Sequence, residues 1–425
     1  MAMRASSSVD FTSIILAGDV ISWPQAIGEP LGLTRALMGQ KQHLPAFKLF
    51  VGMTSSDTLS AANVGGGLLG LNGAGTNRRL AASGLIDIVP THVSRVPELI
   101  RTGVIRIDVA LVRVRPTKHS NTFSVGVICD YTTAMIKSAR CVVAEIDERL
   151  PLTAHDALVS RDDIDIFTLA DTDEILMPDP EPSAVESEVA RRIAEMIPDR
   201  ATVQLGIGTL PVAVGRALFN HRDLGVHSGV VSDIFVDLVE RGVVTNAYKG
   251  LDPGESAIGG LFGTRRLLDH ATNNSSVAMR SVEYTHQPAC LARVRALHSI
   301  NSAVEIDLTG QVNSELAGGR YLGAVGGQVD FVRGARLSPG GRSIIAVPST
   351  TPDVKQSRIV ADLCGRPVTT ARSDVDLIVT EYGVADLWGQ PFSERAKRLI
   401  AIAHPAFRDE LSAALIRNNM PTRIA

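Results

Sequence analysis

The sequence has little of what nucleic-acid binding, an oxidising compartment or a membrane requires. Aromatic residues make up 4% of its 425 residues and the net charge is −3, so neither base stacking nor general polyanion binding is expected. The N-terminus lacks a clear signal-peptide core and cleavage site. No run approaches the ~20 apolar residues of a membrane span. Four scattered cysteines show neither metal-ligand spacing nor a disulfide pattern: Cys129, Cys141, Cys290 and Cys364. We expect a cytoplasmic protein that binds no metal, no nucleic acid and no membrane.

The length and one proline-rich segment indicate two domains. A chain of 425 residues exceeds what one small core usually accommodates. The segment MPDPEPS, Met177 to Ser183, contains three prolines, which exclude a regular element and stiffen a linker. Ser183 and Glu186 then form a capping-box pattern ahead of apolar residues at helical spacing. We predict an N-terminal domain over 1–178 and a C-terminal domain over 184–425.

Both halves alternate short β-rich runs with helical segments, which predicts an α/β fold. Such runs, apolar on both faces, are typical of mostly parallel sheets covered by helices. We therefore expect two tandem open α/β domains. The predicted strands cover Phe47–Met53, Ile86–Val89, Val109–Val114, Cys141–Ile146, Ala201–Ile207, Ile344–Ser349 and Asp376–Gly383.

The segment Gln204 to Leu218 is the first candidate ligand loop. A predicted strand enters Gly206 and Gly208, and a helix is expected from near Pro211. Glycines allow close backbone approach, and a helix N-terminus offers unpaired N–H groups to an anion. A pyrophosphate, a thioester oxygen or a carboxylate would suit this loop. An ordinary strand–helix turn is the alternative.

A second candidate loop extends from Tyr321 to Phe331. It places Gly323, Gly326 and Gly327 within five residues, which suggests backbone amides free to stabilise an oxyanion. A glycine-rich turn between strands is the alternative.

Carboxylate and histidine candidates lie elsewhere in the C-terminal half. Glu381 follows a strongly apolar run, and the carboxyl end of a buried parallel strand is where α/β sheets bind ligands. Its carboxylate could instead accept backbone hydrogen bonds. His227 and Asp233 invite a comparison with a hydrolytic triad, but no G-x-S-x-G elbow is present.

Taken together, these segments resemble the acetyl-CoA hydrolase/CoA-transferase family, in particular the 4-hydroxybutyrate CoA-transferase-like members. Several motifs occur in order between about Gln204 and Leu411: GIGTLP, INSAVEIDLTGQVNSE, GGQVDF, SRIV, VTEYGVADL and AHPAFRDEL. FSVGVICDYTTAMIKSAR, from Phe123, looks like the counterpart in the first half. The resemblance implies two α/β domains with the active site between them. It also implies a coenzyme A thioester as substrate, no tightly bound cofactor, and a homodimer or higher homo-oligomer.

The resemblance also reveals a departure at the family's nucleophile. In this family a glutamate attacks the thioester and forms a glutamyl-CoA intermediate. That glutamate ends a segment like LGIHTE, whereas this chain has LGVHSG and therefore Gly229. A family segment like TNDP is THQP here, which puts His286 or Gln287 at the position of an asparagine. Gly327 and Glu381 match family positions that line the site.

The departure leaves three hypotheses open. The space at Gly229 could admit water or another acceptor for direct attack on the thioester, with a general base. Another carboxylate, such as Asp233, could preserve transferase chemistry. The protein could also bind acyl-CoA or a partner without catalysis. The catalytic candidates are Glu381, Gly327, His286 and His227. The candidates for binding the coenzyme A ester are Gly206, Ile207, Gly208, Gly326 and Gln328.

Overall fold

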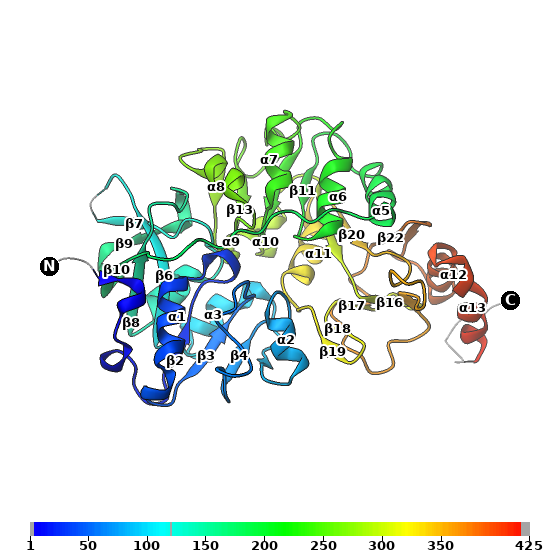
Figure 1. Ribbon diagram of the computed structural model, residues 1–425. Coiled ribbons are helices and arrows are strands. Elements are labelled where there is room, and N and C mark those ends of the chain that lie inside the picture. The colour runs from blue at the N-terminus through cyan, green and yellow to red at the C-terminus, as the bar shows by residue number, and fades with distance from the viewer. Residues whose placement is uncertain (1–3, 120, 418–425) are drawn as a thin grey trace.

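The computed structural model describes residues 4–119 and 121–417 and contains two large sheets flanked by helices (Figure 1). The first sheet draws its strands from residues 4–169 and the second from residues 202–386. Both are mostly parallel, as a chain that alternates strands with helices should build. The α/β class predicted from the sequence is confirmed.

Within the described ranges the first sheet has ten strands, eight of them parallel in the order β1-β10-β8-β6-β2-β3-β4-β5. The other two pair antiparallel, β7 with β6 and β9 with β7. Their bounds are β1 (Arg4–Ala5), β2 (Val20–Ser22), β3 (Lys48–Val51), β4 (Leu68–Gly70), β5 (Asp87–Ile88), β6 (Val109–Pro116), β7 (Thr122–Ser124), β8 (Cys141–Ile146), β9 (Leu158–Ser160) and β10 (Ile166–Leu169). The run predicted at Val109–Val114 is buried throughout, as a central parallel strand covered on both faces must be.

The second sheet has eight strands within residues 121–417, in the order β14-β13-β12-β11-β15-β20-β22-β23. All neighbours are parallel except β22 and β23. The bounds are β11 (Thr202–Gln204), β12 (Gly225–Ser228), β13 (Ser256–Ile258), β14 (Val277–Met279), β15 (Leu297–Ser302), β20 (Arg342–Ala346), β22 (Leu377–Thr380) and β23 (Gly383–Asp386). Smaller sheets contain β16 (Glu305–Asp307), β17 (Val312–Asn313), β21 (Ile359–Val360), β18 (Leu316–Ala317) and β19 (Arg320–Tyr321).

The helices connect these strands, and none in the described ranges is long and apolar enough to cross a membrane. Their bounds are α1 (Leu31–Gln40), α2 (Asn77–Ala82), α3 (Val96–Arg101), α4 (Thr132–Ser138), α5 (Ala184–Ala194), α6 (Thr209–Ala217), α7 (Asp233–Glu240), α8 (Arg265–Ala271), α9 (Val282–Thr285), α10 (Pro288–Leu291), α11 (Gln328–Leu337), α12 (Phe392–Ile402) and α13 (Arg408–Arg417).

The strand predicted over Asp376–Gly383 is a hairpin instead. β22 ends at Thr380, and β23 returns antiparallel from Gly383. Gly383 has φ 152°, a backbone conformation that favours glycine. Glu381 therefore sits in the turn of a hairpin rather than at the free end of a strand.

Two seams of hydrogen bonds join the halves of the chain. In the first seam Cys129 N–H donates to the Gly259 carbonyl at 2.9 Å, and Leu261 N–H donates to the carbonyl of Val127 at 2.8 Å. In the second seam, Val93 N–H donates to the Gly326 carbonyl at 3.0 Å. The largest apolar cluster also contains residues from both sheets. The boundary between 178 and 184 lies between the two sheets, but it remains a prediction.

The capping box predicted at the start of α5 is present. Ser183 accepts from the Glu186 N–H, and the Glu186 carboxylate accepts from the Ser183 N–H at 2.8 Å. Glu186 also accepts from the hydroxyl of Thr209, so the same carboxylate connects the starts of α5 and α6.

Replacing the cap tests this contribution. Ser183→Ala leaves an N–H of the first turn without its acceptor, so we expect the free energy of unfolding to fall by about 1 kcal/mol. Ser187→Ala is the matched control, because Ser187 is exposed and its hydroxyl donates only to the Ser183 carbonyl; its effect should stay within about 0.5 kcal/mol. Urea unfolding measures both. Equal losses would contradict the cap.

Candidate active site

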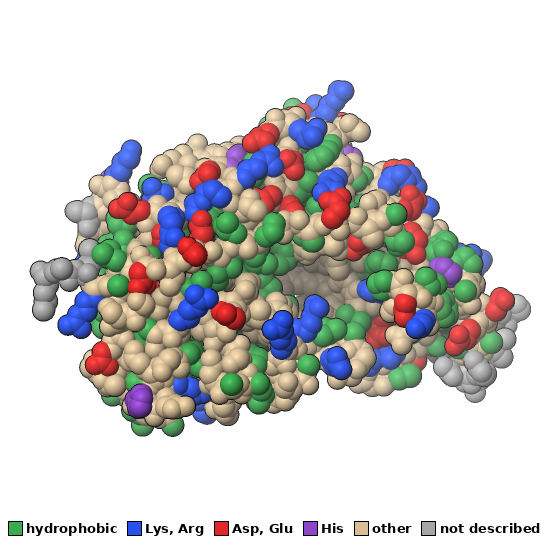
Figure 2. Space-filling model, in the orientation of Figure 1, with side chains coloured by type: hydrophobic (Ala, Val, Ile, Leu, Met, Phe, Trp, Pro, Cys, Tyr) green, Lys and Arg blue, Asp and Glu red, His purple; other side chains and the backbone are tan. Residues whose placement is uncertain are grey.

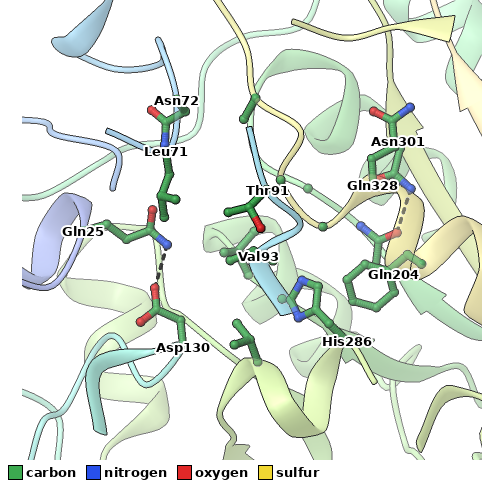
Figure 3. A pocket seen from close by; sticks show the side chains of 18 of the residues that line it. Gln25, Leu71, Asn72, Thr91, Val93, Asp130, Gln204, His286, Asn301 and Gln328 are labelled. Atoms are coloured by element: carbon green, nitrogen blue, oxygen red, sulfur yellow. Dashed lines mark hydrogen bonds between the residues drawn. The ribbon is translucent and has the colours of Figure 1, made fainter. Parts of the chain in front are cut away.

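A cavity of about 230 Å³ lies where the two halves meet, between the two seams. Figure 2 shows this face of the molecule hollowed between the N-terminal half and the C-terminal half. The wall of the cavity is rich in side chains that form hydrogen bonds (Figure 3). The polar side chains in the wall are Gln25, Asn72, Thr91, Asp130, Gln204, His286, Asn301 and Gln328.

Both predicted glycine loops reach this cavity. Gly206 lines it from the turn between β11 and α6, and Gly326 lines it from the turn ahead of α11. An adjoining, more open cavity shares Gly206 and Gly326 and adds Ile207. Gly208 is the N-cap of α6, with φ 109°, so its freedom of conformation shapes the turn.

The N-terminus of α11 opens into the cavity. Gly327 is its N-cap, and Gly327 and Gln328 both line the wall. The first N–H groups of a helix have no acceptor within the helix and lie at the positive end of its dipole. They are therefore suited to stabilise the negative oxygen of a tetrahedral intermediate. The Gln328 side chain donates to Thr370 at 3.1 Å, which fixes this residue.

Gly229 lies in the same wall, but the space beside its Cα is filled. A Cβ built on Gly229 would lie 2.6 Å from Cε1 and 2.9 Å from Nε2 of His286. A Cβ on Gly327 would lie 2.4 Å from the same Nε2. The imidazole is thus held between two glycines, and the expectation of open space at Gly229 is wrong at this point.

His286 is buried and neutral. It caps the C-terminal end of α9, and its ring centroid lies 4.6 Å from that of Phe331. Its Nδ1 lies 2.8 Å from the Thr285 hydroxyl. Burial lowers the pKa of His286 to about 3, because the charged form would lose its hydration. The ring can shape the cavity and form hydrogen bonds, but it is a weak base near neutral pH.

Asp130 is the residue that the sequence analysis missed. It follows the apolar run that leaves β7 and precedes α4, and its side chain forms part of the cavity wall. Among the described residues that line the cavity it is the only acidic one. Burial raises the pKa of Asp130 to about 6, against opposing hydrogen bonds from Gln25 and from the Tyr131 and Thr132 amides. A carboxylate directly after a buried run was the signal available in the sequence.

Three residues suggested for catalysis, His227 and Glu381 as general bases and Asp233 as a replacement carboxylate, lie outside this cavity. His227 is buried in β12, with Nε2 3.1 Å from the carbonyl of Thr285. The Glu381 carboxylate accepts from the N–H and hydroxyl of Ser349 at 2.9 and 2.5 Å. Asp233 accepts from the Thr264 N–H and hydroxyl at the start of α7. Their contacts favour structural roles for all three side chains.

The donor set does not suggest a metal centre. In residues 4–119 and 121–417, no group of three or more His, Cys, Asp or Glu side chains is arranged to hold an ion. The wall instead combines amide side chains, a helix N-terminus and one carboxylate.

Fold and site together define an α/β protein with two mostly parallel sheets and a polar-lined cavity between them. The acetyl-CoA hydrolase/transferase N-terminal domain matches residues 4–185, and the C-terminal domain of that name matches residues 263–415. The chain belongs to the acetyl-CoA hydrolase/transferase family, which confirms the resemblance seen in its motifs.

Individual relatives agree over nearly the whole chain. The 4-hydroxybutyrate coenzyme A transferase of Clostridium kluyveri is 38% identical over 404 residues, 92% of each chain. The crystal structure of RipA from Yersinia pestis is 31% identical, with a TM-score of 0.90 over 98% of this chain and 97% of RipA. The 4-hydroxybutyrate CoA-transferase of Porphyromonas gingivalis is 31% identical, with a TM-score of 0.82 over 98% and 97%.

The exclusion between Gly229 and His286 is measurable as a coupling energy. Gly229→Ala forces a methyl group against the imidazole, so we expect the free energy of unfolding to fall by about 1–3 kcal/mol. The same substitution in a His286→Ala background should cost less, because the ring is gone. A double-mutant cycle measures the difference. Gly39→Ala in α1, where a Cβ would have no neighbour within 4 Å, is the matched control. Equal costs in both backgrounds would contradict the packing.

Proposed function

We propose that this protein acts on acyl-CoA thioesters in the cavity between the seams, by hydrolysis or direct acyl transfer without a glutamyl-CoA intermediate. The observation that carries the proposal is the wall at Gly229. There the imidazole of His286 lies against the glycine, and no glutamate belongs to the wall among the described residues. The family model describes hydrolases as well as transferases.

The two cavities suggest how the thioester enters. The adjoining cavity runs between the turn that holds Ile207 and the turn that holds Gly326, and it shares four further residues with the inner cavity. Besides Gly206 and Gly326, the residues common to both cavities are Asn301, Ala324, Gly327 and Gln328. A thin, uncharged chain such as the pantetheine arm suits a passage between two turns. The thioester carbonyl would then lie beside the N-terminus of α11.

The chemistry follows from the wall. Attack on a thioester carbon places negative charge on the carbonyl oxygen, and the first N–H groups of α11 stabilise it there. Hydrolysis by a positioned water is the simplest reaction, since it needs no second substrate. The coenzyme A ester enters as substrate, with no tightly bound cofactor.

One observation keeps a transferase as the second candidate. Asp130 gives the cavity a carboxylate, and a carboxylate nucleophile would allow transfer of coenzyme A to a second acid. Asp233, suggested for that role from the sequence, is bound to Thr264 instead. A binding protein without catalysis is the third candidate, and turnover decides between it and the other two. We also propose that the protein is cytoplasmic. We further propose that it forms a homodimer or higher homo-oligomer, and light scattering tests this oligomeric state.

Free thiol should appear when the purified protein meets its acyl-CoA substrate in the absence of any acceptor acid. We expect continuous release of coenzyme A from at least one thioester in a panel of short and hydroxylated acyl groups, followed with a thiol reagent. Borohydride treatment and intact-mass measurement should find no coenzyme A adduct on the protein. A coenzyme A adduct on a carboxylate would establish transferase chemistry. Calorimetric binding of a thioester without thiol release would leave a binding protein.

Restoring a glutamate tests the role of position 229. Gly229→Glu alone should not gain coenzyme A transfer to an added carboxylic acid, because its side chain and the His286 ring occupy the same space. Gly229→Glu combined with His286→Ala removes that conflict and should gain measurable transfer. His286→Ala alone is the matched control and should gain none. Transfer by the single Gly229→Glu variant would contradict the exclusion.

A further inference from the structure

We propose that Asp130 is the general base that activates the attacking water, an assignment that rests on the proposed hydrolysis. The side chain lines the cavity, Oδ1 accepts three hydrogen bonds, and Oδ2, which accepts one, is the oxygen we assign to the water. It thereby supplies the proton acceptor that neither His227 nor Glu381 can supply from its position.

The two carboxylate oxygens of Asp130 have different environments. Oδ1 accepts from the Tyr131 N–H at 2.5 Å, and from the Thr132 N–H and hydroxyl at 3.2 Å each. Oδ2 accepts a single bond, from Nε2 of Gln25 at 2.7 Å. A carboxylate oxygen has two lone-pair sites, so Oδ2 keeps one site for a water molecule in the cavity.

Gln25 holds Oδ2 in a defined orientation. Its own Oε1 accepts from the Met53 N–H at 3.2 Å, so its amide nitrogen must face Asp130. Figure 3 shows Gln25 and Asp130 joined on one side of the cavity, with His286 and Gln204 across it. A base fixed by a second side chain in this way keeps its geometry through a reaction.

Capping alone does not explain an aspartate here. Oδ1 accepts from the N–H groups of Tyr131 and Thr132 at the start of α4, which an asparagine oxygen would do equally well. Asp130 as a residue is 4% exposed, and a buried charge costs stability unless it is fully paired. The hydrogen bonds to Oδ1 therefore do not explain why an acid stands at position 130, whereas a role as proton acceptor requires one.

The backbone of Asp130 places the base beside the rest of the site. Its carbonyl accepts from the Val282 N–H at 3.0 Å, and its N–H donates to Gly259 at 3.3 Å. Gly259 in turn donates to Ser228 at 3.2 Å, next to Gly229. Asp130 thus belongs to the first seam, and the α11 N-terminus to the second. A thioester between them has the base on one side and the oxyanion donors on the other.

The reaction balances with these groups alone. Oδ2 takes a proton from water as the water oxygen bonds to the thioester carbon, and the C=O electron pair moves to the oxygen beside α11. When the C–S bond breaks, the electron pair leaves with sulfur and Asp130 returns the proton to the thiolate. The products are a carboxylic acid and free coenzyme A. With its pKa raised to about 6, Asp130 is mostly ionised at pH 7 and still close to the pH at which a base is most effective.

The decisive experiment compares pH–rate profiles of thiol release. The wild-type rate should rise with pH through about 6 as Asp130 loses its proton, since the carboxylate is the active form. Asp130→Asn keeps the size of the side chain and an oxygen at the Oδ1 position but removes the ionisable acid, so we expect kcat to fall by about 10²–10⁴-fold and the rise near pH 6 to vanish. Calorimetric binding of a non-hydrolysable thioether analogue should be unchanged.

Gln25→Met gives an independent readout. It removes the hydrogen bond that favours ionised Asp130. The acid limb of the pH–rate profile, where the rate rises with pH, should therefore move to higher pH, while activity at pH values above that limb persists. Glu29→Gln is the matched control, because Glu29 is a buried carboxylate bonded to Thr34 and Ser56 away from the cavity; its profile should match wild type. Thermal melting checks that each variant folds.

Two results would overturn the assignment while the proposed function stands. One is an Asp130→Asn variant that keeps the wild-type rate and acid limb. The other is an acyl adduct on Asp130 without coenzyme A, which would make Asp130 the nucleophile of the hydrolysis. Wild-type protein that releases no thiol from any thioester would instead overturn the proposed function, and this assignment with it. A limb that stays in place in Gln25→Met would also count against Asp130, even if Asp130→Asn fails to fold.

Discussion

The backbone hydrogen bonds that join the two halves are the constraint on which the site depends. Neither sheet contains the site alone, because Asp130 comes from the first half while Gly229, His286 and the α11 N-terminus come from the second. The first seam fixes Asp130 against Gly259, and the second fixes Val93 against Gly326. Backbone bonds tolerate changes of side chain, so the spacing of the walls can persist while the chemistry of the wall residues changes.

Few side chains in the cavity wall can carry a charge, so each of them has a larger influence on the electrostatic potential there. Its described lining holds one carboxylate and one histidine as titratable side chains, and the rest is amide, hydroxyl, glycine or apolar. Burial moves both pKa values toward the neutral forms, to about 6 for Asp130 and about 3 for His286. Away from bulk solvent, the helix dipole of α11 acts with less screening on a charge that develops beside it.

The sequence predicted the family and the α/β class, because motifs and strand periodicity are local properties, and it singled out two glycine turns that the structure places in the cavity wall. It could not predict that His286 would lie against Gly229, since the two are more than fifty positions apart and only the tertiary fold brings them together. Asp130 was missed for the same reason, because its partner Gln25 lies over a hundred positions earlier. Glu381 misled because an apolar run followed by a carboxylate indicates a strand end equally well whether the chain then enters a loop or, as here, a hairpin.

The mutual exclusion of a side chain at 229 and the imidazole at 286 restricts the order in which evolution can alter this wall. A form with a larger residue at 229 and a form with histidine at 286 are separated by an incompatible combination, because a Cβ at 229 would approach Cε1 to 2.6 Å. A change from one form to the other must first remove either the side chain at 229 or the imidazole at 286. The intermediate sequence then has a less tightly packed cavity wall. A change from one form to the other therefore requires two substitutions rather than one.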